Sequence, residues 1–189
     1  MNDTTRYILD AIQSRVWSGF SSPADVERLI DDLLEGDADE ALLRAAVGPE
    51  FASKEAAEAT WPPTTDCDRL DAAFAALDAR GIIALQNAGY TLSEGITEVA
   101  ETLHARGTRE SVRGYCFYHG QDLERAVEGH GIMLAFGSLD DDRENKHKVG
   151  QLVRETLEER GFTVEWSGDP EQRLNLPGLD WKRRSARAV

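Results

Sequence analysis

The first sixty residues carry apolar side chains at helical spacing. One stripe runs through residues 7–16, and a second occupies positions three and four residues apart: Val26, Leu29, Ile30 and Leu33. This spacing puts the apolar residues on one face of an amphipathic helix. Ser22 followed by Pro23 indicates a helix start, because serine caps the first turn and proline fits the first helical position. We therefore expect two amphipathic helices before Gly36.

A third helical segment follows and contains the pair Gly48-Pro49. This pair should interrupt the helix, since proline lacks the backbone N–H that a helix interior uses, and residues 51–60 should resume it. Two prolines at positions 62 and 63 then favour an extended connector. The connector predicts a helical N-terminal region over residues 1–61 and a second domain over residues 62–189.

Beyond the connector, helical stripes alternate with short apolar runs. The runs typical of strands are residues 82–85, 115–118, 132–136 and 162–166, with 173–176 as a returning edge strand. The resulting βαββαβ order predicts an α+β domain with a ferredoxin-like sheet and helices on one face. The alternative is a small parallel α/β sheet in which a short helix near residues 122–128 makes the crossover. That connection has only about a dozen residues, near the lower limit for a crossover, so the ferredoxin-like arrangement is favoured.

The composition narrows the range of partners. The chain has 189 residues and a formal net charge of −14, from 35 acidic and 21 basic residues. Such a surface repels nucleic acid and anionic membranes, so neither is expected as a partner, whereas a protein partner is permitted. No signal peptide and no apolar run of membrane-spanning length is present, and Cys67 and Cys116 form no CxxC pair, so we expect a cytoplasmic protein with free thiols. The oligomeric state stays open.

No cofactor or metal motif is present. The glycines form neither GxGxxG nor GxxxxGK, and the three aspartates at positions 140–142 lack the alternating ligands of a calcium loop. We therefore expect no cofactor and no metal.

The polar cluster that follows the run 115–118 is the first place to look for a site. His119 and Asp122 stand at a strand end, where a histidine and a carboxylate can form an acid–base pair or ligate a metal. The structural alternative is helix capping, in which Asp122 stabilises the first turn of the next helix. We take His119 and Asp122 as candidate catalytic residues. Candidate binding residues come from the same strand ends and the neighbouring turns: Gln86, Asn87, Tyr118, Gln121 and His130.

Several segments resemble a known family. They are residues 83–93, residues 114–122 with 131–137, and residues 164–168 followed by 179–183. Together they resemble a family of uncharacterised bacterial proteins, a domain of unknown function, over roughly residues 66–184. The resemblance implies a fold and a domain boundary but no activity.

Two functions fit these observations. An acidic domain with a helical extension and no assured catalytic group favours a protein-binding or regulatory module. The alternative is a small hydrolase-like enzyme that uses His119 and Asp122. Convergence of these two residues with a third polar group in a cleft would favour the enzyme, and an exposed apolar patch bounded by acids would favour the binding module.

Overall fold

The computed structural model describes residues 2–107, 111–140 and 142–185. The chain forms two compact units. The first comprises the residues up to Thr65 together with the chain from Lys182 onward, and the second runs from Asp66 to Trp181. The segment after Trp181 thus belongs with the N-terminal helices.

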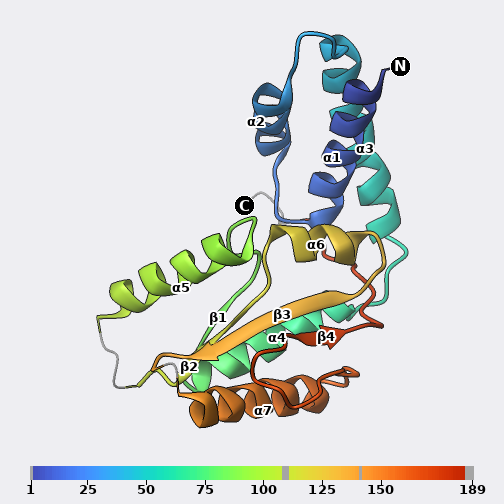
Figure 1. The fold of residues 1–189 in the computed structure, drawn as a ribbon. Helices are drawn as coiled ribbons and strands as arrows, with labels where there is room; N and C mark the ends of the chain where they lie inside the picture. The colour runs from blue at the N-terminus through green and yellow to red at the C-terminus, as the bar shows by residue number, and fades with distance from the viewer. Residues whose placement is uncertain (1, 108–110, 141, 186–189) are drawn as a thin grey trace. The chain divides into compact units, whose positions relative to one another are not determined.

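The first unit contains helices α1 (Asp3–Ser18), α2 (Pro23–Leu33) and α3 (Glu40–Glu58), which pack side by side (Figure 1). Ser22 caps α2 and forms a capping box with Asp25, and Pro23 occupies the first turn, as the sequence predicts. The stripes on the facing sides of the helices meet in one core: Ile8, Ile12, Val16, Val26, Ile30, Leu43 and Val47.

The predicted break at Gly48-Pro49 is wrong, because α3 runs through Pro49 without interruption. Contacts on both sides of the proline hold the helix. Val47 is buried in the core just before it, and Glu50 accepts a hydrogen bond from Trp17 Nε1 at 2.6 Å just after it. Tertiary packing on α1 therefore outweighs the one backbone hydrogen bond that proline removes.

The segment after Trp181 binds the end of α3 and the loop after α1. Ser185 donates from its N–H and its Oγ to Glu58 Oε1, at 2.8 and 3.0 Å. Lys54, whose side chain is buried, donates to Ser185 Oγ at 2.7 Å and pairs with Glu58 at 3.0 Å. The Arg183 guanidinium lies 4.5 Å from the centre of the Phe20 ring. The basic segment thus neutralises part of an acidic helical unit.

The second unit is built on a four-stranded sheet. Its strands are β1 (Ile82–Leu85), β2 (Gly114–Phe117), β3 (Ile132–Ser138) and β4 (Leu174–Leu176), in the spatial order β1-β2-β3-β4. β1 and β2 are parallel, whereas β2–β3 and β3–β4 are antiparallel. Its helices are α4 (Asp66–Ala79), α5 (Leu92–Arg106), α6 (Gly120–Val127) and α7 (Arg143–Glu159).

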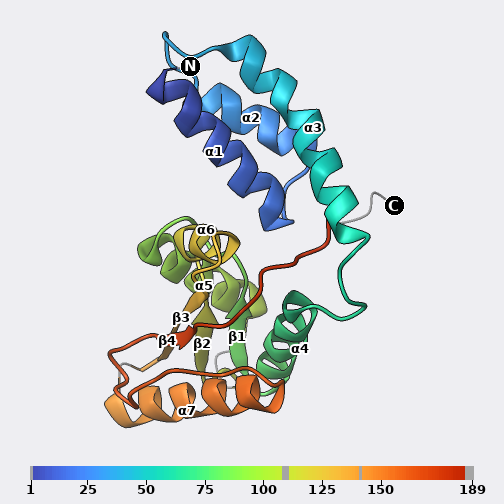
Figure 2. The ribbon, with the colours of Figure 1, turned by 90° about the vertical axis from the view of Figure 1, so that its right-hand side faces the viewer.

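The two faces of the sheet are covered by different helices (Figure 2). α4 and α7 pack on one face and bury Cys116, Leu134 and most of the core. α5 packs on the other face over β1, and it approaches Phe117 of β2 closely at Gly95. A Cβ on Gly95 would lie 2.2 Å from the Phe117 ring, so only glycine allows this approach. α6 contacts β3 and fills the connection between β2 and β3.

The α+β class is observed, but the sheet does not have the ferredoxin-like order. A ferredoxin-like sheet splits each βαβ unit by an intervening antiparallel strand, whereas β1 and β2 are hydrogen-bonded neighbours. The parallel alternative is not found either, because β2 and β3 are antiparallel and α6 makes no parallel crossover. The expected strand at residues 162–166 contributes only an isolated bridge between Glu165 and Asn175. The expected edge strand at residues 173–176 is observed as β4, and it pairs with β3.

The two cysteines are thiols that form no disulfide, and both are buried in the second unit. None of the helices in the described part of the chain is long and apolar enough to cross a membrane.

Candidate functional site

The carboxyl ends of β1 and β2 carry the loops that precede α5 and α6. Because the two strands are parallel neighbours, both loops lie at one edge of the sheet. Thr91 caps α5 by accepting a hydrogen bond from the Glu94 N–H, and Glu94 accepts one from the Thr91 N–H at 2.8 Å. The Gly120 N–H at the start of α6 donates to Gly89 O at 2.9 Å. The two helix starts therefore form one connected framework.

A cluster of three polar side chains, two of them buried, lies in this framework. His119 Nε2 is 3.1 Å from Asp122 Oδ2, so the two predicted candidates are in contact. Asp122 also accepts from the His119 N–H at 3.4 Å, which is the capping role that the sequence offered as the alternative. Arg173, just before β4, donates from Nη1 to both oxygens of Asp122 at 2.9 and 3.0 Å and lies 3.4 Å from His119 Nε2. His119, Asp122 and Arg173 form what we call the polar cluster.

Arg173 is the member that sequence reasoning missed. It lies 51 residues after Asp122, and nothing in the local pattern pairs the two. The sequence does indicate that Asp122 has a partner, because a carboxylate next to a buried strand needs a cation or several hydrogen-bond donors. That signal does not say which of the 21 basic residues supplies it.

Burial lowers the pKa of His119 below its usual value. Asp122 and Glu94 oppose this shift by favouring the charged ring, whereas the positive charge of Arg173 adds to it. The lowered pKa means a neutral imidazole near pH 7. Its Nδ1 is buried and makes no hydrogen bond with the described residues.

The lowered pKa predicts how stability depends on pH. Between the usual value of about 6.5 and the lower folded value, the unfolded chain binds a proton at His119 that the folded chain does not, so unfolding becomes easier as the pH falls. We expect the free energy of unfolding to drop more steeply between about pH 7 and 5 in the wild type than in His119→Gln. The two slopes should differ by at most ~1.4 kcal/mol per pH unit, the value for one proton. Urea melts at several pH values measure both slopes, and equal slopes would contradict the prediction.

Two candidate binding residues, Gln86 and Tyr118, are engaged in the core on the α4 side. Tyr118 is fully buried between the rings of Phe74 and Trp181. Its hydroxyl donates to Gln86 Oε1 at 3.0 Å, and Gln86 Nε2 donates to Asp71 Oδ1 at 2.8 Å. These side chains hold the end of β1 to α4 and to the end of β2.

The other candidate binding residues do not join the polar cluster. Asn87 has a positive φ of 53° in the turn after β1, a conformation that asparagine tolerates better than most residues. Gln121 is exposed on α6. His130 is exposed in the turn before β3, 3.9 Å from Glu128, and no interaction among the described residues links it to His119. A role for these residues in binding stays a prediction.

A small cleft adjoins the polar cluster on the α5 side of the sheet. Its volume is about 230 Å³. It is lined by side chains from α5, the sheet, the start of α7 and the segment before β4: Leu92, Ile96, Tyr115, Ala135, Phe136, Lys146, Pro170, Glu171, Gln172 and Arg173. We call it the α5 cleft. Arg173 belongs to both features, because Nη1 binds Asp122 while Nε and Nη2 make no hydrogen bond with the described residues.

Among the described residues, neither a cysteine nucleophile nor a set of metal ligands joins the polar cluster. Cys116 is fully buried on the opposite face of the sheet, and burial raises the pKa of its thiol, so it is no nucleophile for His119. Among the described residues, no group of three or more His, Cys, Asp or Glu side chains could hold a metal ion. The arrangement instead fixes an arginine at the rim of a cleft.

Comparison with protein families shows which family the chain belongs to. The family described as "Domain of unknown function (DUF6891)" matches residues 1–185, so the chain belongs to this family. The match includes the N-terminal helices, which the resemblance over residues 66–184 leaves out. No curated protein and no solved structure matches the chain.

Proposed function

We propose that this family member is a protein-binding module whose α5 cleft holds one apolar side chain and a neighbouring carboxylate of its partner. The observation that carries the proposal is how the guanidinium of Arg173 is hydrogen-bonded. Its Nη1 is bound by the buried Asp122, and its Nε and Nη2 make no hydrogen bond with the described residues. An arginine fixed in this way binds a carboxylate with little further loss of side-chain entropy.

Another part of the cleft wall is apolar and exposed. Leu92 and Ile96 are one helical turn apart on α5, and they are 47% and 41% exposed. They line the cleft together with Tyr115 of β2. Exposed leucine and isoleucine side chains beside a hollow are typical of a surface that a partner covers.

The size of the α5 cleft favours a side chain over a small-molecule ligand. Its volume of about 230 Å³ is below the roughly 300–1,000 Å³ of ordinary ligand pockets. It is enough for one leucine or phenylalanine side chain. The rest of a protein partner would lie on the surface around the opening.

The free donors of Arg173 favour recognition of a single acid. Lys146 is held by both oxygens of Glu171 at 2.9 Å, so this pair contributes no net charge. Arg173 also lines the cleft, and its Nε and Nη2 make no hydrogen bond with the described residues. Because the chain carries −14 overall, a strongly acidic partner is repelled, and one carboxylate beside an apolar residue is the better match.

The test uses a small probe with the two required groups. N-acetyl-L-phenylalanine carries a phenyl ring and a carboxylate, and N-acetyl-L-phenylalaninamide is its neutral analogue. Titration of the ¹⁵N-labelled protein should shift the amide signals of Leu92, Ile96 and Arg173 with the acid, and several-fold more weakly with the amide. Equal shifts with both probes, or shifts confined to other elements, would reject the proposal.

A matched pair of variants isolates the apolar wall. Leu92 and Leu42 are both in the first turn of a helix and are 47% and 41% exposed, but Leu42 lies in the first unit. Leu92→Ser should weaken binding of the acid probe about three- to tenfold, because the probe ring loses part of its apolar contact. Leu42→Ser should leave the affinity unchanged, and a similar loss in both variants would contradict the assignment.

A hydrolase-like activity is a second candidate. Two observations favour it: His119 and Asp122 converge with Arg173 beside the α5 cleft, and Nδ1 of His119 makes no hydrogen bond with the described residues. Asp122 at Nε2 orients the ring, which leaves Nδ1 as the possible base. If this candidate holds, the protein cleaves p-nitrophenyl acetate and His119→Gln abolishes the cleavage without unfolding the protein. Equal rates for the two proteins would exclude it.

A further inference from the structure

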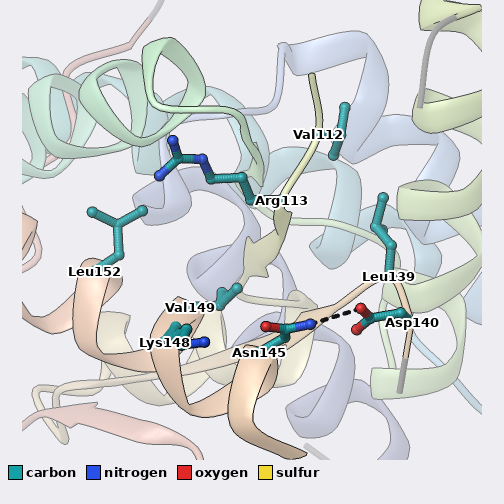
Figure 3. A pocket seen from close by; sticks show the side chains of 8 residues that line it. All are labelled: Val112, Arg113, Leu139, Asp140, Asn145, Lys148, Val149 and Leu152. Atoms are coloured by element: carbon teal, nitrogen blue, oxygen red, sulfur yellow. Dashed lines mark hydrogen bonds between the residues drawn. The ribbon is translucent and has the colours of Figure 1, made fainter. Parts of the chain in front are cut away.

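A second and larger hollow lies against α7. Its volume is about 470 Å³, within the range of roughly 300–1,000 Å³ that is usual for small-molecule sites. Residues from the entry to β2, the end of β3 and one face of α7 line it: Val112, Arg113, Leu139, Asp140, Asn145, Lys148, Val149 and Leu152 (Figure 3). We call it the α7 pocket.

The part of the wall that α7 supplies is one continuous helical face. Asn145, Lys148, Val149 and Leu152 follow the spacing i, i+3, i+4, i+7, so they lie above one another on the helix. Val149 is buried at the base of this face, and Leu152 extends the apolar surface along it. Leu139 and Val112 supply apolar surface from the sheet side (Figure 3). A ligand in the pocket therefore meets apolar surface on both sides.

The polar part of the lining is positive on balance. It holds two cations, Arg113 and Lys148, and one acid, Asp140. Asp140 is already satisfied, since it accepts from Asn145 Nδ2 at 2.8 Å and from the Asp142 N–H at 3.3 Å. The Arg113 guanidinium makes no hydrogen bond or ion pair with the described residues, and Lys148 pairs only with the exposed Glu144, at 2.7 Å. Two cations thus line the pocket on a chain that carries −14, and Arg113 is unpaired among the described residues.

We propose that the α7 pocket binds a small organic anion, in which an apolar body of one or two rings carries a single anionic head group. Val149, Leu152 and Leu139 contact the body, and Arg113 and Lys148 hold the head group. A bare inorganic anion would leave the apolar walls uncovered, and a neutral hydrocarbon would leave the two cations unused. The site is separate from the α5 cleft and does not depend on the function proposed for it.

The test uses two fluorescent probes that differ in the head group. 8-Anilinonaphthalene-1-sulfonate has an apolar body and one sulfonate, and N-phenyl-1-naphthylamine has a similar body without charge. We expect one equivalent of the sulfonate to bind, with ¹⁵N amide shifts at Arg113, Asn145 and Leu152. The double variant Arg113→Gln/Lys148→Gln should weaken this binding about tenfold or more, since two charge-assisted contacts are lost, and should change the binding of the neutral probe less than about twofold.

The control removes two exposed basic side chains outside the pocket. Arg125→Gln/Arg154→Gln changes the net charge equally but alters no lining residue, so the sulfonate should bind as it does to the wild type. If Arg113→Gln/Lys148→Gln melts at a lower temperature, the single variant Lys148→Gln, at a side chain that is 61% exposed, replaces it. The proposal is overturned if the sulfonate does not bind the wild type below ~1 mM. It is also overturned if the two double variants behave alike, or if the shifts map to Leu92 and Ile96.

Discussion

Replacement of Arg173 by methionine should lower the free energy of unfolding by about 3 kcal/mol. The substitution keeps the apolar stem but leaves Asp122, whose side chain is 2% exposed, without its cation. Removal of one partner from a buried ion pair costs about 3–5 kcal/mol, and the 35% exposure of the Arg173 side chain places the expected value at the low end. Urea denaturation monitored by tryptophan fluorescence measures the loss.

A second substitution separates this mechanism from a simple loss of packing. If the unpaired carboxylate causes the loss, Asp122→Asn/Arg173→Met should be more stable than Arg173→Met alone, because the variant no longer buries an isolated charge. Arg154→Met breaks the exposed pair with Glu158 and should cost less than about 1 kcal/mol. Strictly additive losses in the double variant would show that Asp122 and Arg173 are not coupled.

A chain that ends at Trp181 should lose about 2–4 kcal/mol of stability in the first unit. Glu58 would lose the two hydrogen bonds from Ser185, and Phe20 would lose the Arg183 guanidinium. Both hydrogen bonds end on the same oxygen of Glu58, so we count them together as one contact to a charged group, which contributes about 1.5–3 kcal/mol. The cation–π contact adds about 0.5–1 kcal/mol. Native-state hydrogen exchange should show faster exchange in α1, α2 and α3.

The same experiment contains its controls. Exchange in the strands of the second unit should not change, because the contacts of Ser185 and Arg183 named above lie within the first unit. A chain that ends at Ser185 retains these contacts and should match the full-length protein. Uniformly faster exchange in both units after truncation at Trp181 would contradict the assignment of the tail to the N-terminal helices.

The local features of this protein could be predicted from its sequence. Ser22 and Pro23 fix the start of α2, because a helix cap depends on side chains within three or four residues. The apolar stripes give the helices and the cores, since their spacing matches the period of the helix. The pairing of His119 with Asp122 is also local, because residues three apart at a helix start lie close together.

Features that rest on long-range contacts depended on the tertiary structure. Helical stripes and apolar runs do not determine which strands become neighbours. The sequence therefore predicted a ferredoxin-like order, whereas β1 and β2 are parallel neighbours in the structure. The same holds for α3, whose passage through Pro49 depends on packing against α1.

The sequence by itself determined the α+β class, most helix positions and the end of β2 as the place of a polar cluster. The fold decided the rest of the site, because it brings Arg173 from 51 residues away onto Asp122 and places Leu92 and Ile96 in the wall of the α5 cleft. The physical reason is that a buried carboxylate requires a partner, whereas only the path of the chain determines which cation reaches it.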